Sequence, residues 1–285
     1  MLRSNNPVLS RSSEFQAGYQ SQPGQPYQQY QQPYQGYQGY QGQVPPYDPQ
    51  GIQDPAPAPV AAQTMTIDDV LTKSAVTMGT LILVAAATMV LLPLELLWPV
   101  TAVTGLVAFG TVLLVSFRRA INPAFVLAYS AVEGVFIGAI SKTFEYVYPG
   151  IVMPAVLGTF VTAVVTLAAY KYLRVRVSGR LRKMVIIGTT ALCGVYLLNF
   201  VLSLFGVHLG VVEVGPGAGL LAMAVSAIGV VLAVLNLIMD FELVENGIRN
   251  QLPASESWRA AFGITVTMVW LYTELLRILS YFQRS

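Results

Sequence analysis

Residues 74–116 read SAVTMGTLILVAAATMVLLPLELLWPVTAVTGLVAFGTVLLVS, and Glu95 is the only charged residue among them. An apolar helix of about 20 residues spans the ~30 Å hydrocarbon core of a bilayer. Pro93 and Pro99 divide the stretch into two runs of roughly that length, because proline interrupts a helix. The sequence therefore predicts two membrane-spanning helices joined by a short turn.

Similar apolar runs continue to the end of the chain. Apolar residues make up 54% of the sequence and charged residues 11%, whereas soluble domains carry about 25% charged residues. Lipid offers an open backbone no hydrogen-bond partner, and the runs lack the alternation of barrel strands. We therefore predict an all-α membrane protein, a seven-transmembrane-helix bundle within residues 64–285, with spans at 71–92, 98–116, 121–141, 151–171, 184–206, 218–240 and 260–281.

Residues 1–63 have a different composition. Gln, Tyr, Pro and Gly dominate them, and neither Lys nor Arg occurs from Ser12 to Thr72. Such a segment buries too little aliphatic surface to offset the entropy of ordering. We predict a disordered cytoplasmic tail, without a cleavable signal peptide because the chain does not open on an apolar run. Its role stays open between a solvated tether and a docking arm.

The basic residues predict the orientation in the membrane. A cytoplasmic N-terminus places all sixteen Lys and Arg on the cytoplasmic side except Lys142, Arg277 and Arg284. The loop at 171–183 alone contributes six of them. Cytoplasmic loops are enriched in Lys and Arg, so we expect the N-terminus inside and the C-terminus outside.

Several classes of function are disfavoured by composition. The net charge of +2 gives no reason to expect nucleic-acid binding, and Cys193 and His208 are the only cysteine and histidine. Zinc sites and histidine-dependent catalysis therefore lack the side chains they need, and we expect no enzymatic activity and no cofactor. A retinal receptor is disfavoured because the seventh span contains no lysine.

Three carboxylates fall within or at the end of predicted spans. An ionisable group at the bilayer centre costs at least ~2.5 kcal/mol, so each one needs a partner or a water-filled cavity. Glu133 lies near the middle of the third span and has no basic neighbour on its own helix. Glu274 precedes Arg277 by three residues, a spacing that permits local pairing. Asp240 ends the sixth span, where a boundary position in the headgroup region is the alternative explanation.

Two glycines flank the third-span carboxylate on one helical face. Gly134 and Gly138 are four residues apart, the small-xxx-small spacing that lets two membrane helices approach closely. We expect a helix contact there rather than a catalytic feature.

These landmarks carry a resemblance to a known family. The seven spans, the basic turn Arg118-Arg119 after the second, Asp240 at the end of the sixth and Leu275-Leu276-Arg277-Ile278-Leu279 in the last resemble the Bax inhibitor-1 family, in its bacterial type, over about residues 70–282. The resemblance implies a pH-sensitive calcium leak channel in the plasma membrane. It also implies that two acidic residues, in the sixth and seventh helices, share a proton and gate the pore, and that an arginine after the second helix latches the closed state.

The family roles transfer to particular positions of this chain. The first acid falls on Asp240, and the latch falls on Arg118 or Arg119. The second acid falls on Glu274 in a gapped alignment and on Thr267 in an ungapped one. These two positions are seven apart and share a helix face, so both stay open. We expect Glu133 to line the pathway, with accessory roles for Glu242, Glu245 and Arg277.

The physical chemistry of paired carboxylates suits a gate. Two carboxylates in a low dielectric cannot both ionise cheaply, so they titrate as a unit. After deprotonation they repel each other and offer the oxygen ligands that calcium prefers. We therefore expect weak calcium binding at Asp240 and Glu274, with calcium as the transported ion. The alternatives are a polytopic regulator of another membrane protein, such as a protease, without transport activity, and a proton-coupled transporter.

Overall fold

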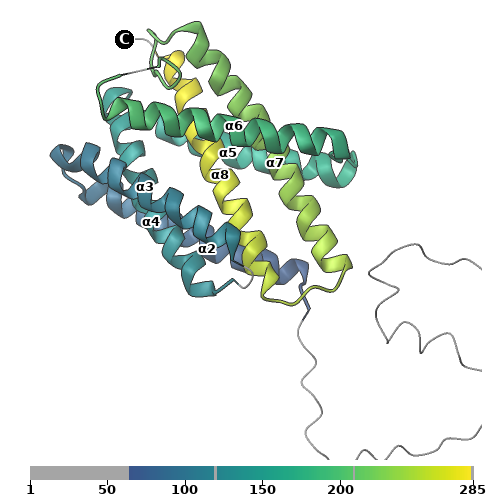
Figure 1. Ribbon diagram of the computed structural model, residues 1–285. Helices are drawn as coiled ribbons and strands as arrows, with labels where there is room; N and C mark the ends of the chain where they lie inside the picture. Colours follow the sequence, from purple (N-terminus) through teal and green to yellow (C-terminus); the bar gives the residue numbers. More distant parts are fainter. Residues whose placement is uncertain (1–63, 119–120, 208, 284–285) are drawn as a thin grey trace, which may run out of the picture. The chain divides into compact units, whose positions relative to one another are not determined.

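The computed structural model describes residues 64–118, 121–207 and 209–283, and these residues form a bundle of helices without strands (Figure 1). Seven of the helices are long and apolar enough to cross a membrane, as predicted. They are α2 (Ile67–Leu91), α3 (Leu97–Phe117), α4 (Pro123–Val147), α5 (Val152–Tyr172), α6 (Gly179–Ser203), α7 (Leu220–Arg249) and α8 (Glu256–Tyr281). The predicted tail at 1–63 and His208 lie outside the described residues.

The helix ends follow from local sequence. The Thr66 side chain caps α2 by accepting a hydrogen bond from the Asp69 amide at 3.2 Å. Asn122 caps α4 by accepting from the Ala124 amide, and Pro123 occupies the first turn, where it removes no helical hydrogen bond. At the other end of α2 the chain turns at Pro93 into the short 3₁₀ helix η1 (Leu94–Leu96), which leads directly into α3.

Five helices extend beyond the predicted spans by about a turn or more. The helix α4 ends at Val147 rather than at 141, α6 begins at Gly179 rather than at 184, and α7 continues to Arg249 rather than ending at 240. The helices α2 and α8 begin at Ile67 and Glu256, four residues before the predicted starts at 71 and 260. The added turns carry charged side chains at the membrane surface, so hydropathy alone could not assign them to a helix. The number and order of the spans are as predicted.

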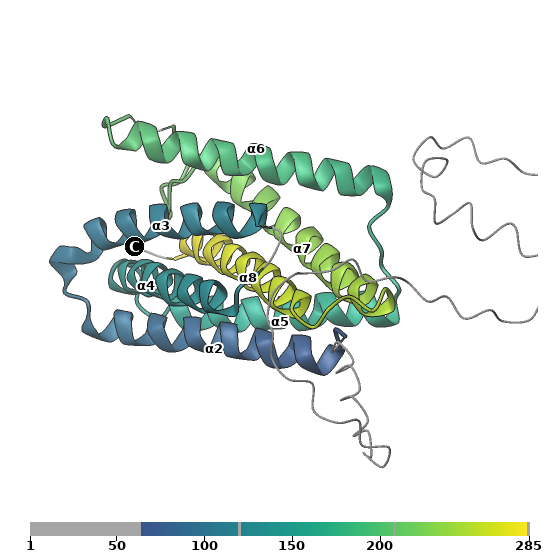
Figure 2. The same cartoon turned by 60° about the horizontal axis from the view of Figure 1, so that its bottom comes forward.

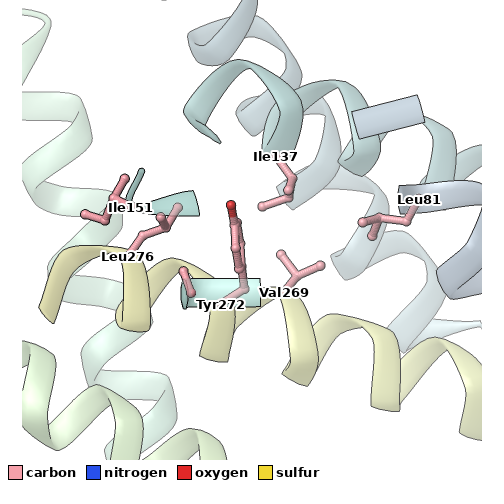
Figure 3. Packing of buried hydrophobic residues seen from close by; sticks show 7 residues of the cluster. Leu81, Ile137, Ile151, Val269, Tyr272 and Leu276 are labelled. Carbon is pink, nitrogen blue, oxygen red and sulfur yellow. The ribbon is translucent and has the colours of Figure 1, made fainter. Parts of the chain in front are cut away.

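The last helix is the centre of the bundle. The helix α8 packs against α2, α4, α5 and α7, while α3 rests on α4 and α6 rests on α7 (Figures 1 and 2). The largest buried cluster surrounds Tyr272 of α8, which lies among Leu81, Ile137, Ile151 and Leu276 (Figure 3). Many large apolar side chains of the outer helices are exposed, as lipid-facing helices require.

The helices α2 and α4 approach each other closely at the predicted glycines. A Cβ atom on Gly134 would lie 2.7 Å from the carbonyl oxygen of Leu81, and one on Gly138 would lie 2.5 Å from that of Ala85. Real Cβ atoms do not approach other atoms so closely, so only glycine permits this spacing. The expectation of a helix contact at Gly134 and Gly138 is confirmed.

The described chain begins with a fixed attachment to the bundle. Thr64 forms an isolated bridge with Pro253, and the Met65 amide donates to the Leu252 carbonyl at 2.7 Å. The Met65 side chain is buried, with its sulfur against Gly247 of α7. Residues 64 and 65 therefore lie across the connection between α7 and α8, at the end of the chain from which residues 1–63 extend.

Candidate functional site

The Asp240 side chain, on α7, faces α8. Its Oδ2 accepts a hydrogen bond of 2.6 Å from the Thr267 hydroxyl. One turn earlier, Gly263 faces the same carboxyl, and a Cβ there would make an ordinary van der Waals contact of 3.4 Å with Oδ1. Among the described residues, no basic side chain forms an ion pair with Asp240. Within the described part of the chain, this carboxyl therefore has a hydroxyl partner and no countercharge within hydrogen-bond reach.

Glu274 lies in a separate polar cluster. It is fully buried, and its Oε1 accepts hydrogen bonds from the Tyr196 hydroxyl at 2.7 Å and from the Trp270 indole at 3.1 Å. Its Oε2 pairs with Arg277 at 3.3 Å, so the local pairing indicated by the sequence is present. Gly229 of α7 makes room for this carboxyl, because a Cβ there would lie 2.7 Å from its carbon.

Arg277 extends the cluster towards the connection between α6 and α7. Its guanidinium donates to the Tyr196 hydroxyl at 2.9 Å and to the Ser226 hydroxyl at 3.4 Å, and it stacks over the Tyr196 ring. Ser226 also shares a hydrogen bond with the Tyr281 hydroxyl, which donates in turn to the Glu213 carbonyl. The cluster thus joins α6, α7 and α8 and reaches the loop before α7.

The structure brings Asp240 together with Thr267 and not with Glu274. Thr267 and Glu274 are seven residues apart on α8, which is about 10 Å along the helix axis. Of the two alternatives for the second acidic position, the contact with Asp240 is made by Thr267, as in the ungapped alignment. The two carboxyls therefore have separate surroundings in this conformation.

Glu133 is buried on α4, with 6% of its surface exposed. Tyr129 lies one turn earlier on the same helix and is also buried. The Tyr129 ring packs edge-on against Phe262 of α8, with 4.9 Å between ring centroids. Glu133 therefore lies one turn from a ring that packs against the central helix, and it is on a different helix from Asp240.

Arg118, which directly follows α3, packs against Phe125 of α4. The Arg118 guanidinium is exposed and stacks over the Phe125 ring at 4.4 Å, and the Arg118 carbonyl accepts hydrogen bonds from Arg259. The structure does not bring Arg118 into contact with Asp240. Arg119, the other candidate for the latch, lies outside the described residues.

The two accessory acids fasten the basic loop to α7. Glu242 pairs with Arg182 at 2.7 Å, and Glu245 pairs with Arg176 at 3.1 Å and with Arg249. The Tyr170 hydroxyl also donates to Glu245. The hydrogen bond to Glu245 raises the pKa of the Arg176 guanidinium above its usual value, so this pair stays charged. Both carboxylates thus neutralise nearby arginines.

The carboxylates of the bundle are dispersed. Among the described residues, no group of three or more His, Cys, Asp and Glu side chains comes close enough to hold a metal ion. A cation at Asp240 would therefore meet one carboxylate, with the Thr267 hydroxyl as a second oxygen ligand.

Sequence reasoning found Arg277 but missed the other two partners of Glu274. Tyr196 and Trp270 contribute two of its three donors, yet each stands in an apolar run where an aromatic residue is unremarkable for a membrane helix. The one usable signal was the spacing of Trp270 and Glu274, four residues apart on one face.

A family model described as Bax inhibitor 1 like matches residues 6–284, which is nearly the whole chain. No curated protein matches the sequence.

Proposed function

Because the chain belongs to the Bax inhibitor-1 family of multi-pass membrane proteins, we propose that it is a pH-sensitive calcium leak channel of the plasma membrane. The observation that best supports this proposal is the Asp240 carboxyl, which faces α8 with Thr267 as its hydrogen-bond donor. A carboxyl in a membrane helix without a countercharge indicates a role in an ion or proton pathway.

Asp240 alone would then carry the proton switch. Facing it are Thr267 and Gly263 of α8, and the nearest acid on its own helix, Glu242, is paired with Arg182. At low pH the carboxyl is neutral and remains packed against α8, which keeps the pathway closed. As pH rises it ionises, and a bare charge in this setting draws in water or a cation. Flux therefore increases with pH.

Calcium suits such a site because it binds oxygen ligands and tolerates irregular geometry. One carboxylate and one hydroxyl hold the ion weakly, and weak binding lets it leave, as conduction requires. Glu274 and Arg277 form an ion pair farther along α8. In this proposal the pair blocks the ion pathway at a second position. Glu133 lines the route from α4.

The test is calcium uptake into dye-loaded proteoliposomes that contain the purified protein, scanned from about pH 5 to pH 8, a range that brackets a carboxyl in a membrane helix. We expect uptake to rise by at most about tenfold per pH unit, the limit for a single proton. Asp240→Asn abolishes this dependence, because the amide does not titrate. Glu242→Gln is the matched control on the same helix and keeps it.

Two results would contradict the proposal. One is folded protein that passes no more calcium than empty liposomes. The other is an Asp240→Asn variant whose uptake follows pH as in the unmodified protein. If calcium uptake rises with pH more steeply than one proton allows, the hypothesis that Asp240 and Glu274 share a proton would be favoured instead.

A second candidate function is a membrane adaptor that regulates another membrane protein. The observation that favours it is the attachment of residues 64 and 65 to the α7–α8 connection, because a partner bound to the preceding tail would be held beside that connection.

Deleting residues 1–63 separates the two functions, and the cut spares the buried side chain of Met65. We expect the truncated channel to keep its calcium uptake within about twofold, since the bundle and its contacts are intact. An adaptor would instead lose its partner in a crosslinking experiment in membranes. Loss of uptake with the bundle still folded would show that the tail belongs to the conducting unit.

A further inference from the structure

A groove runs along the outside of the bundle between α3 and α4. It has a volume of about 160 Å3, and its floor is formed by Val115 and Tyr129, which are buried. Its rim is formed by Leu114 and Phe125, which are 67% and 43% exposed. An apolar rim so exposed on a membrane helix faces lipid, so the groove opens to the bilayer.

Arg118 closes one end of this groove. It follows Thr111, at the other end of the α3 wall, by seven residues and therefore lies on the same face. Seven residues of helix are about 10 Å, roughly two-thirds of one leaflet of the ~30 Å hydrocarbon core. The groove thus combines an apolar channel of acyl-chain depth with a cation at the membrane surface.

Arg118 differs from four of the arginines on its side of the bundle. Arg176, Arg182, Arg249 and Arg259 each pair with a carboxylate of α7 or α8. Arg118 stacks on Phe125 and forms no ion pair with any residue that the structure describes. Its guanidinium therefore keeps its charge and its donors for a ligand.

We infer that the α3–α4 groove is a binding site for an anionic phospholipid. The acyl chain lies along Leu114, Ala128 and Val132, and the headgroup phosphate accepts hydrogen bonds from Arg118. The planar guanidinium presents paired donors that match a phosphate, and the cytoplasmic leaflet is rich in anionic lipids. This site depends on insertion in a membrane and not on calcium conduction, so it goes beyond the proposed function.

The experiment measures lipid binding to the full-length, delipidated protein in detergent by native mass spectrometry. The probes are phosphatidylglycerol and phosphatidylcholine with identical acyl chains. We expect phosphatidylglycerol to bind about tenfold more tightly, because phosphatidylcholine offers the same phosphate but adds a choline cation that offsets its attraction to Arg118. Arg118→Gln removes this preference. Arg180→Gln, an exposed basic residue at the start of α6, is the matched control and keeps it.

A larger side chain inside the groove tests whether the lipid acyl chain binds there. Ala128 lines the groove and is exposed, so Ala128→Phe blocks it without disturbing the core. We expect this variant to weaken both lipids by a similar factor while the protein remains folded. The inference is overturned if Arg118→Gln and Arg180→Gln have equal effects, if the two lipids bind equally to the unmodified protein, or if Ala128→Phe leaves binding unchanged.

Discussion

Replacing Arg277 with methionine is expected to lower the free energy of unfolding by about 3–5 kcal/mol, the cost of stranding a buried charge. Glu274 is fully buried, and Arg277 is its ion-pair partner. Methionine is similar in length and keeps most of the apolar packing, so the lost interaction is chiefly electrostatic. The loss also frees the Tyr196 and Ser226 hydroxyls, which accept from Arg277.

The measurement is the unfolding transition of the purified protein when sodium dodecyl sulfate is titrated into mild detergent. Arg249→Met is the matched control, because Arg249 forms an exposed pair with Glu245. Exposed pairs contribute about 0–1 kcal/mol. Equal losses for Arg277→Met and Arg249→Met would show that the buried pair has no special weight.

A second substitution should rescue the first. The double variant Glu274→Gln with Arg277→Met removes both charges, while the glutamine carbonyl still accepts hydrogen bonds from Tyr196 and Trp270. Replacing a buried ion pair by uncharged groups is often neutral. We therefore expect the double variant to recover most of the lost stability, which a purely steric defect at Arg277 would not permit.

The spans could be predicted because they rest on composition. A run of about 20 apolar residues has one stable form in lipid, and the breaks at Pro93, Arg118 and Gly215 are chemically plain. The spatial order of the helices could not be predicted in this way. That α8 is central follows from side-chain packing between helices, and all seven helices are apolar enough to occupy that position.

The candidate site, too, could be predicted only in part from the sequence. Asp240 was identifiable because an acid at the end of an apolar run is costly to bury. Its partner was not, since Thr267 and Glu274 share a face of α8 and only the register between α7 and α8 selects one of them. Gly229 of α7 contributes to this register, because a Cβ there would lie 2.7 Å from the carboxyl carbon of Glu274.

The largest loss of structure is expected for Gly138→Leu. A single added Cβ would lie 2.5 Å from the Ala85 carbonyl oxygen and 2.7 Å from the Thr88 Cβ. Both atoms belong to α2, whose backbone cannot move without losing its contact with α4 at Gly134 as well. We expect Gly138→Leu to prevent native packing and Gly138→Ala to cost about 1–3 kcal/mol, the usual cost of overpacking.

Gly79 on α2 supplies the control, because alanine there is expected to raise the stability rather than lower it. A Cβ at Gly79 meets no atom within 4 Å, so Gly79→Ala adds no clash. Alanine is favoured over glycine within a helix by about 1 kcal/mol, so this variant should be at least as stable as the unmodified protein. The same detergent titration compares the two positions. If Gly138→Ala were as stable as Gly79→Ala, close backbone contact between α2 and α4 would not determine the stability of the bundle. If that contact holds the two helices together, Gly138→Ala is much less stable than Gly79→Ala.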